Sequence, residues 1–165
     1  RLTSDRAGRD RYDDEEPAWS ATNRITFVRT RIGSSRGQIY TMNADGSTVT
    51  ALTQRGRAFG QPTWSPSGRL IAFTATHGQH GMVIEVAAAD GSGMRPVSLP
   101  RWTSYNPVWT PNGKVAFLVD RGTGTSIYTV NPDGTGLSKL PATWANIQQL
   151  IKLAWGSASL PPAAC

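Results

Sequence analysis

The sequence is poor in the residues that build most chemical sites. Its one cysteine, Cys165, is the last residue, so an internal disulfide cannot form. Its two histidines, His77 and His80, have no cysteine or further histidine nearby, and Asp120 is the one other side chain that could join them. A zinc site needs three or four such ligands. We therefore expect no metal site and no cofactor.

Long apolar segments are also missing. No apolar run reaches the length of about 18 residues that a membrane-spanning helix needs. The chain begins Arg1-Leu2-Thr3-Ser4 and shows no apolar stretch of a secretory signal. No amphipathic helix is convincing, although residues 144–151 could form a short helical turn. These absences favour a fold made of short strands.

What the sequence does contain is one block repeated three times. Each copy has a Pro-x-Trp, a turn, an Ile/Val-x-Phe strand, an apolar-aromatic strand and an Asp-Gly turn. The anchoring Trp19, Trp64 and Trp109 are evenly spaced, since 64 − 19 = 45 and 109 − 64 = 45. Four short strands at such a period predict a blade of a β-propeller. The repeated tryptophans are then expected to pack between blades, as is Trp155.

The predicted fold class is therefore all-β: a propeller of four-stranded antiparallel blades, with three full repeats and partial end strands. The blades are expected at 17–53, 62–99 and 107–140, and the polar segment 4–16 as a surface loop. Residues 1–3 match the closing strand of a preceding blade, and 153–156 the opening strand of a following one.

The number of repeats leaves three arrangements open. Propellers close with about four to eight blades, so we expect the chain to be a fragment of a larger ring. Alternatively, the end strands meet in one composite fourth blade, or two chains share a ring. Open blade edges would favour self-association.

The turn residues have a structural explanation. Asp45, Asp90 and Asp133 each precede a glycine at the same position of the repeat. A carboxylate there can accept hydrogen bonds from nearby backbone N–H groups. We therefore interpret these aspartates as turn residues and not as metal ligands or catalytic acids.

These blocks resemble the repeat of the TolB-like β-propeller family, close to P-x-W-S-P-D-G, I-A-F, I-Y-V-M-N-x-D-G-S and R-x-L-T. The Pro-Asp dipeptide of that pattern is replaced by Pro66-Ser67, Pro111-Asn112 and Ala21-Thr22. The resemblance implies a bacterial, periplasmic or secreted, non-catalytic scaffold that binds a protein. One alternative is the substrate-gating propeller of a prolyl-oligopeptidase-like serine peptidase whose catalytic domain lies elsewhere. Another is a carbohydrate-binding propeller.

The non-repeating residues are the candidates for binding. In a blade, the loops between the second and third strands lie on the same face as the loops between blades. That face is expected to carry Arg31, Arg36, Arg55, Arg57, Arg101, Trp102, Tyr105, Arg121 and Trp144, with Arg29, Phe59 and the histidines among them. The alternative is that these arginines only solvate loops.

The charge supports an acidic partner. The net charge is +6, but the first 20 residues hold four arginines and six acids, 4 − 6 = −2, which leaves +8 on the remainder. A basic, aromatic surface suits an acidic peptide or protein surface, or an anionic glycan. Lysine clusters and nucleic-acid motifs are missing, which argues against nucleic acid.

One motif imitates a catalytic site. Gly33-Ser34-Ser35-Arg36-Gly37 matches G-x-S-x-G, which marks a nucleophile on a strand-to-helix turn in α/β-hydrolases. Here it falls between two predicted strands, and no helix follows. We therefore expect a hairpin loop and no enzymatic activity.

Overall fold

We analysed a computed structural model of the chain. The structure describes residue 3 and residues 11–54, 56–78 and 81–141. Within these ranges it contains no helix that could cross a membrane. Of the expected end strand at 1–3, residues 1–2 lie outside the described residues and Thr3 is not in a strand. The expected end strand at 153–156 and the expected turn at 144–151 also lie outside the described residues.

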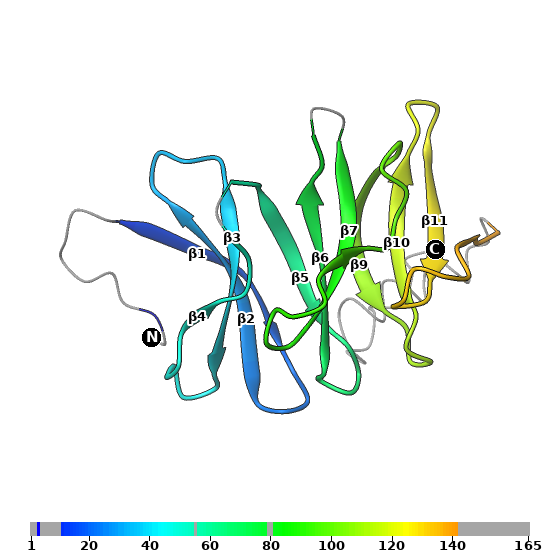
Figure 1. The fold of residues 1–165 in the computed structure, drawn as a ribbon. Helices are drawn as coiled ribbons and strands as arrows, with labels where there is room; N and C mark the ends of the chain where they lie inside the picture. The colour runs from blue at the N-terminus through cyan, green and yellow to red at the C-terminus, as the bar shows by residue number, and fades with distance from the viewer. Residues whose placement is uncertain (1–2, 4–10, 55, 79–80, 142–165) are drawn as a thin grey trace, which may run out of the picture.

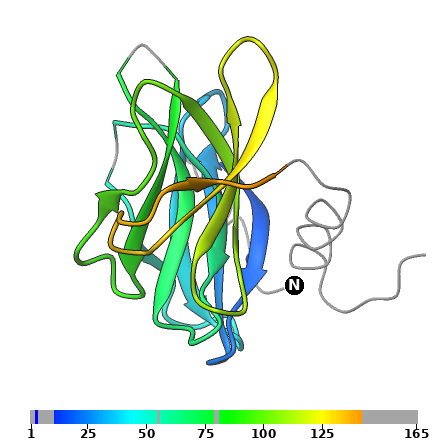
Figure 2. The same cartoon turned by 90° about the vertical axis from the view of Figure 1, so that its right-hand side faces the viewer.

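The described residues form three antiparallel sheets of four strands, each in chain order. Blade 1 comprises β1 (Tyr12–Trp19), β2 (Arg24–Arg31), β3 (Gly37–Asn43) and β4 (Thr50–Ala51). Blade 2 comprises β5 (Phe59–Trp64), β6 (Leu70–Thr76), β7 (Met82–Ala88) and β8 (Arg95–Pro96). Blade 3 comprises β9 (Thr103–Trp109), β10 (Val115–Asp120), β11 (Thr125–Val130) and β12 (Ser138–Lys139). The sheets stand side by side in Figure 1 and one behind another in Figure 2. The predicted all-β blade architecture is confirmed.

The first strand of each blade begins earlier than the sequence predicted, by 17 − 12 = 5, 62 − 59 = 3 and 107 − 103 = 4 residues. The expectation of a loop over 4–16 is therefore wrong for residues 12–16, which belong to β1. Their polar side chains hide the strand pattern, and a bulge between Glu15 and Ala18 shifts the register against β2. Pairing with β2, and not the apolar content of the segment, makes it a strand.

Two hydrophobic cores hold the sheets together. The core between blades 1 and 2 contains Val28, Ile39, Leu52, Phe59, Trp64, Ile71, Phe73, Ala75, Val83 and Ala87. The core between blades 2 and 3 contains Ala72, Ile84, Val86, Val97, Trp109, Val115, Phe117, Val119, Tyr128 and Val130. Each sheet thus contributes alternate side chains to its two faces, as β-strand geometry requires.

The anchoring tryptophans do not share one environment. Trp64 and Trp109 are only 7% and 6% exposed, which confirms that they pack between blades. Trp109 also donates its indole N–H to the Thr63 carbonyl of blade 2, at 3.1 Å. Trp19 is 60% exposed, so the same expectation is wrong for it. Blade 1 is the first of the three described sheets, and no described sheet lies beyond it to cover this side chain.

A chain of side-chain hydrogen bonds links the first strands of the three blades, β1, β5 and β9, which we call the inner strands. Glu16, Gln61 and Asn106 precede the repeated prolines, and each has a positive φ of 52–53° at a bulge. A Glu16 carboxylate oxygen accepts from the Gln61 backbone N–H at 2.5 Å, and the Gln61 amide oxygen accepts from that of Asn106 at 2.8 Å. Each blade thus satisfies a backbone donor that the bulge of the next blade leaves unpaired.

The two ends of the sheets differ. We call one the turn end, which holds the turns between first and second and between third and fourth strands. We call the other the loop end, which holds the loops between second and third strands and those joining blades. Figure 1 shows the loop end at the top and the turn end at the bottom, as the blade topology predicted.

Candidate functional site

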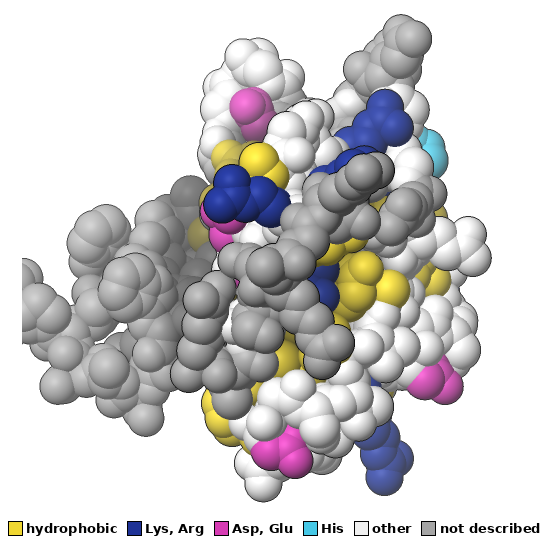
Figure 3. Space-filling view, turned by 90° about the vertical axis from the view of Figure 1, so that its left-hand side faces the viewer, with side chains coloured by type: hydrophobic (Ala, Val, Ile, Leu, Met, Phe, Trp, Pro, Cys, Tyr) yellow, Lys and Arg dark blue, Asp and Glu magenta, His cyan; other side chains and the backbone are white. Residues whose placement is uncertain are grey.

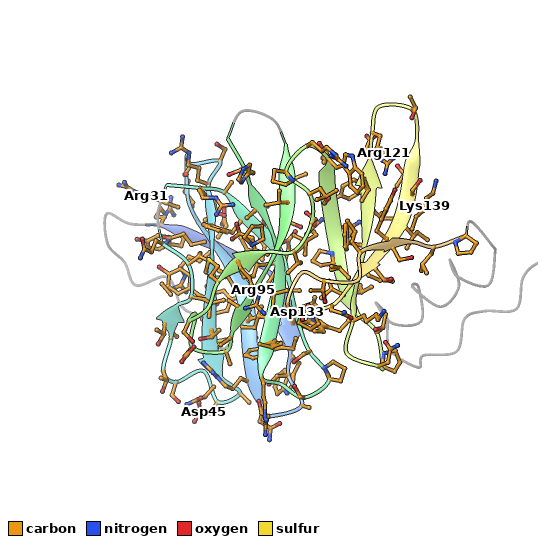
Figure 4. All side chains as sticks on the ribbon, turned by 45° about the vertical axis from the view of Figure 1, so that its right-hand side comes forward. Arg31, Asp45, Arg95, Arg121, Asp133 and Lys139 are labelled. Atoms are coloured by element: carbon orange, nitrogen blue, oxygen red, sulfur yellow. The ribbon has the colours of Figure 1, made fainter. Side chains whose placement is uncertain are left out.

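The aspartates of the turn end are bonded within their own turns. Asp45, Asp90 and Asp133 accept the backbone N–H two residues later at 2.8, 2.9 and 2.9 Å, as predicted. The pKa of each aspartate lies below its ordinary value because of two hydrogen bonds from the residue two positions later. The bond from the hydroxyl of that residue has the larger effect, and the bond from its backbone N–H has the smaller. These carboxylates are committed to their own turns. Figure 4 shows Asp45 at this end and Arg31 and Arg121 towards the other.

The loop end contains most of the predicted binding residues. Arg36, Arg57, Arg101, Trp102 and Arg121 lie in its loops, and Arg31 ends β2. Tyr105 instead lies within β9, so its assignment to a loop is wrong, and Phe59 is buried in β5. Arg55 and Trp144 lie outside the described residues, as does His80. Figure 3 shows the molecule from the side of blade 1, with basic side chains in the upper half and at the lower right and acidic side chains in both halves.

Arg29 is fixed inside blade 1 rather than in a loop. Its Nε and Nη2 each donate to the Asp14 carboxylate at 2.7 Å, and its guanidinium lies 5.0 Å from the centre of the Tyr40 ring. The bond to Asp14 raises the pKa of Arg29, against the opposing effect of burial. The paired geometry of this contact is that of a strong charge-assisted bond.

Arg57 takes a comparable place in blade 2. Its Nη2 lies 2.8 Å from Glu85 Oε1, and Glu85 is only 4% exposed. The distance is that of an ion pair, but the angle is unfavourable for a hydrogen bond, and Arg57 Nη2 and Glu85 Oε2 have no hydrogen-bond partner. We take the contact as electrostatic. Arg57 is held further by its Nε, which donates to the Thr76 carbonyl at 2.7 Å.

In blade 3 the guanidinium group of Arg121 lies against aromatic rings. Arg121 is 4.0 Å from the centre of the Trp102 ring and donates through Nη2 to the Tyr128 hydroxyl. Arg101 lies 5.2 Å from the same Trp102 ring. Trp102 is half-buried and packs against the core between blades 2 and 3, so it supports the arginines as well as offering contact area.

Arg29, Arg57 and Arg121 contact the same position of the repeat in their three blades. Phe27, Phe73 and Phe117 pair across the sheet with Tyr40, Glu85 and Tyr128, which are therefore equivalent. Arg29, Arg57 and Arg121 reach this position from a strand, from a loop between blades and from a loop within a blade, respectively. Because the arginines are not equivalent in the sequence, its period did not reveal their common location. In the sequence, the only signal for this location was the excess of arginine and aromatic residues outside the repeat.

The loop end of blade 1 is hollowed beside the loop that leads to blade 2. A hollow of about 290 Å³ is lined by Tyr12, Arg29, Arg31, Ser34, Arg36, Gln38, Gly56 and Arg57. A second hollow of about 370 Å³ lies beside it and is lined by Arg11, Arg31, Ile32, Gly33 and Ser34. The structure therefore brings together Arg31, Arg36 and Arg57 of the predicted set, and keeps Arg101 and Arg121 apart on blade 3.

The G-x-S-x-G segment forms the β2–β3 loop, as predicted. Its Ser34 hydroxyl accepts from the Arg36 backbone N–H at 3.0 Å, an interaction local to the loop. Among the described residues no cluster of three metal-ligating side chains occurs. The arginines that line the first hollow are suited to holding an anionic group, because guanidinium groups donate charge-assisted hydrogen bonds.

Solved structures resemble this fold at low sequence identity. A TolB-assigned protein from Agrobacterium tumefaciens matches with a TM-score of 0.68 and 22% identity, over 84% of this chain and 50% of that chain. TolB from Acinetobacter baumannii matches with a TM-score of 0.60 and 22% identity, over 84% and 33%. A puromycin-hydrolyzing peptidase from Mycobacterium tuberculosis matches with a TM-score of 0.64 and 19% identity, over 81% and 24%. The chain thus spans half or less of each of these proteins.

Two sequence comparisons complete the assignment. The comparison with curated proteins gave no match. The family model of the TolB beta propeller domain matches residues 2–159, which is nearly the whole chain. With three four-stranded blades in the structure, this match shows that the chain belongs to the TolB beta propeller domain family.

Proposed function

We propose that the chain is a non-catalytic propeller scaffold whose loop end binds an acidic segment of a protein partner. The observation that carries the proposal is the asymmetry of the two ends. Acidic side chains of the turn end are bonded within their own turns, whereas Arg36, Arg57, Arg101 and Arg121 gather at the loop end. The turn end also carries Arg69, Arg95 and Lys114, and the loop end carries Asp120, so the loop end differs in its excess of arginines. Such an excess attracts a partner of the other sign.

The scaffold holds these side chains at fixed places. Arg57 is anchored by Thr76 and Glu85, and Arg121 by Trp102 and Tyr128. Binding side chains that are already ordered lose less conformational entropy when a partner arrives. Rigid presentation of arginines is thus the mechanism that we propose for binding.

The test is the salt dependence of binding to an acidic peptide. We expect a peptide of four glutamates to bind at low salt, and its affinity to fall several-fold as screening shortens the range of the charges. A peptide of four glutamines is the control, and we expect it not to bind. Affinity that is equal for both peptides, or unchanged by salt, would contradict the proposal.

A second candidate is a substrate-gating propeller of a serine peptidase. It is favoured by the similarity to the puromycin-hydrolyzing peptidase, of which this chain covers 24%. Treating any protein that contains this chain with a fluorophosphonate probe separates the two candidates. Labelling of a serine outside this chain would favour gating, and no labelling would favour the scaffold. Labelling of Ser34 would contradict both.

We also propose an extracytoplasmic location. Its support is membership of the TolB beta propeller domain family, together with the resemblance to TolB structures. Fractionation of cells that express the parent protein tests it. Recovery with a cytoplasmic marker enzyme would exclude this location.

A further inference from the structure

The first hollow, at the loop end of blade 1 beside the loop that leads to blade 2, has features of a subsite. It is walled by the β2–β3 loop on one side and by the loop between β4 and β5 on the other. We infer that this hollow binds one carboxylate group of the acidic partner, an inference that rests on the proposed function. The group comes from the end of a peptide or from an acidic side chain, and both sources share the same recognition chemistry.

The lining has one sign of charge. Arg29, Arg31, Arg36 and Arg57 contribute four guanidinium groups, and no carboxylate is among the described residues that line the hollow. The two acids that pair with them, Asp14 and Glu85, are outside the lining. A ligand carboxylate in the hollow would therefore meet donors and no acid of the lining.

These acids hold two of the arginines in place. Asp14 engages Nε and Nη2 of Arg29, and Glu85 with the Thr76 carbonyl engages Nη2 and Nε of Arg57. Nη1 of each guanidinium is the nitrogen that we assign to the ligand. Because the side chains are held in place, binding does not have to order them.

The mouth of the hollow is braced by Arg36. Its Nη1 donates to the Gly56 carbonyl at 3.3 Å, which joins the β2–β3 loop to the β4–β5 loop. The Gln38 amide adds a second link by donating to the Thr53 carbonyl at 2.9 Å. Arg36 is exposed, and its planar fork matches the two oxygens of a carboxylate. Arg36 is thus the arginine best placed to move onto an arriving ligand.

The experiment compares peptides and variants of the full chain. The peptides are four glutamates with a free C-terminal carboxylate and the same sequence amidated. The variants are Arg36→Ala, Arg36→Lys and the control Arg69→Ala, which removes an equally exposed arginine from the turn end. We expect Arg36→Ala to weaken binding about tenfold, the value of a charge-assisted hydrogen bond, and Arg36→Lys to restore part of it. Arg69→Ala should bind like the wild type.

The two peptides identify the source of the carboxylate. Weaker binding of the amidated peptide assigns the subsite to a chain terminus, and equal binding assigns it to a side chain, provided that Arg36→Ala weakens both. Arg36→Ala binding as tightly as Arg69→Ala would overturn the subsite, while a salt-dependent affinity would still support the proposed function.

A second measurement examines the hollow without any peptide. Acetate alone is titrated while the Nε–H signals of the arginines are followed by NMR. We expect saturable shifts at Arg29 and Arg57, weakened in Arg36→Ala, and no saturable shift at Arg69. Such shifts would support the subsite even if no acidic peptide bound and the proposed function failed. Equal responses at Arg29 and Arg69 would overturn it.

Discussion

The turn end and the loop end of these sheets are built by different rules. At the turn end, three Asp-Gly turns repeat the same bond from an aspartate to a backbone N–H two residues later. At the loop end, Arg29, Arg57 and Arg121 reach one blade position along three different routes. The aspartates of the turn end are therefore set by local chemistry and the arginines of the loop end by tertiary contacts, which is why we place recognition at the loop end.

The largest expected effect comes from a pair of glycine substitutions, one at each end. Gly91 has φ +86° in a turn, and a Cβ there would lie 2.9 Å from the Leu52 carbonyl oxygen of blade 1. Gly122 has φ +80° in a loop, with nothing within 4 Å of a Cβ. We expect Gly91→Ala to lower the free energy of unfolding by about 2–4 kcal/mol and Gly122→Ala by about 1 kcal/mol. Urea unfolding measures both, and equal losses would show that the turn at Gly91 is packed no more tightly than the loop at Gly122.

The next largest effect concerns the inner strands, which connect the two ends. Gln61 accepts from the Asn106 backbone at 2.8 Å and from the Thr74 hydroxyl at 2.7 Å. Gln61→Ala leaves both donors without this acceptor, so we expect a loss of about 1–2 kcal/mol in the free energy of unfolding. Gln54→Ala, at an exposed position of the loop end, is the control and should change little. A neutral Gln61→Ala would show that the inter-blade bonds do not stabilise the array.

The smallest effect is the pH dependence of the turn end. The pKa of Asp45, Asp90 and Asp133 is lower in the folded chain than its ordinary value of about 3.9. Their contribution to stability is therefore complete above about pH 4 and is lost as pH falls through the lowered folded pKa. The effect is small because these carboxylates are solvent-exposed.

Substitution of all three aspartates by asparagine isolates this contribution. We expect the variant to lose less stability than the wild type between about pH 5 and pH 2, as measured by urea unfolding at each pH. Parallel pH profiles for the two proteins would show that the turn bonds do not depend on the charge of the aspartates.

The repeat made most of the fold predictable. The blade count, the Asp-Gly turns and the packing of Trp64 and Trp109 all follow from side chains that recur with the period. The start of β1 was not predictable, because the polar residues Asp13, Glu15 and Glu16 do not show a strand pattern and the strand depends on pairing with β2. Positive φ at Glu16, Gln61 and Asn106 was also missed, although all three precede the proline of each Pro-x-Trp and such residues usually adopt extended conformations.

The candidate site was predictable only in part. The topology of a blade assigned Arg36, Arg57 and Arg101 to one end, but it could not show which arginines meet. Arg29 was assigned to a loop, yet its side chain is held by Asp14 and Tyr40 within blade 1. Such contacts depend on side-chain direction across neighbouring strands, and a repeat period carries no information on them.

The most direct test of the central claim removes two charges from each end. Arg36→Ala combined with Arg101→Ala changes the loop end, and Arg69→Ala combined with Lys114→Ala changes the turn end by the same net charge. The measurement is the affinity of each double variant for the peptide of four glutamates at low salt. We predict that the loop-end variant binds at least about tenfold more weakly than the wild type and that the turn-end variant binds within about twofold of it. Equal weakening of the two variants would contradict the claim that recognition belongs to the loop end.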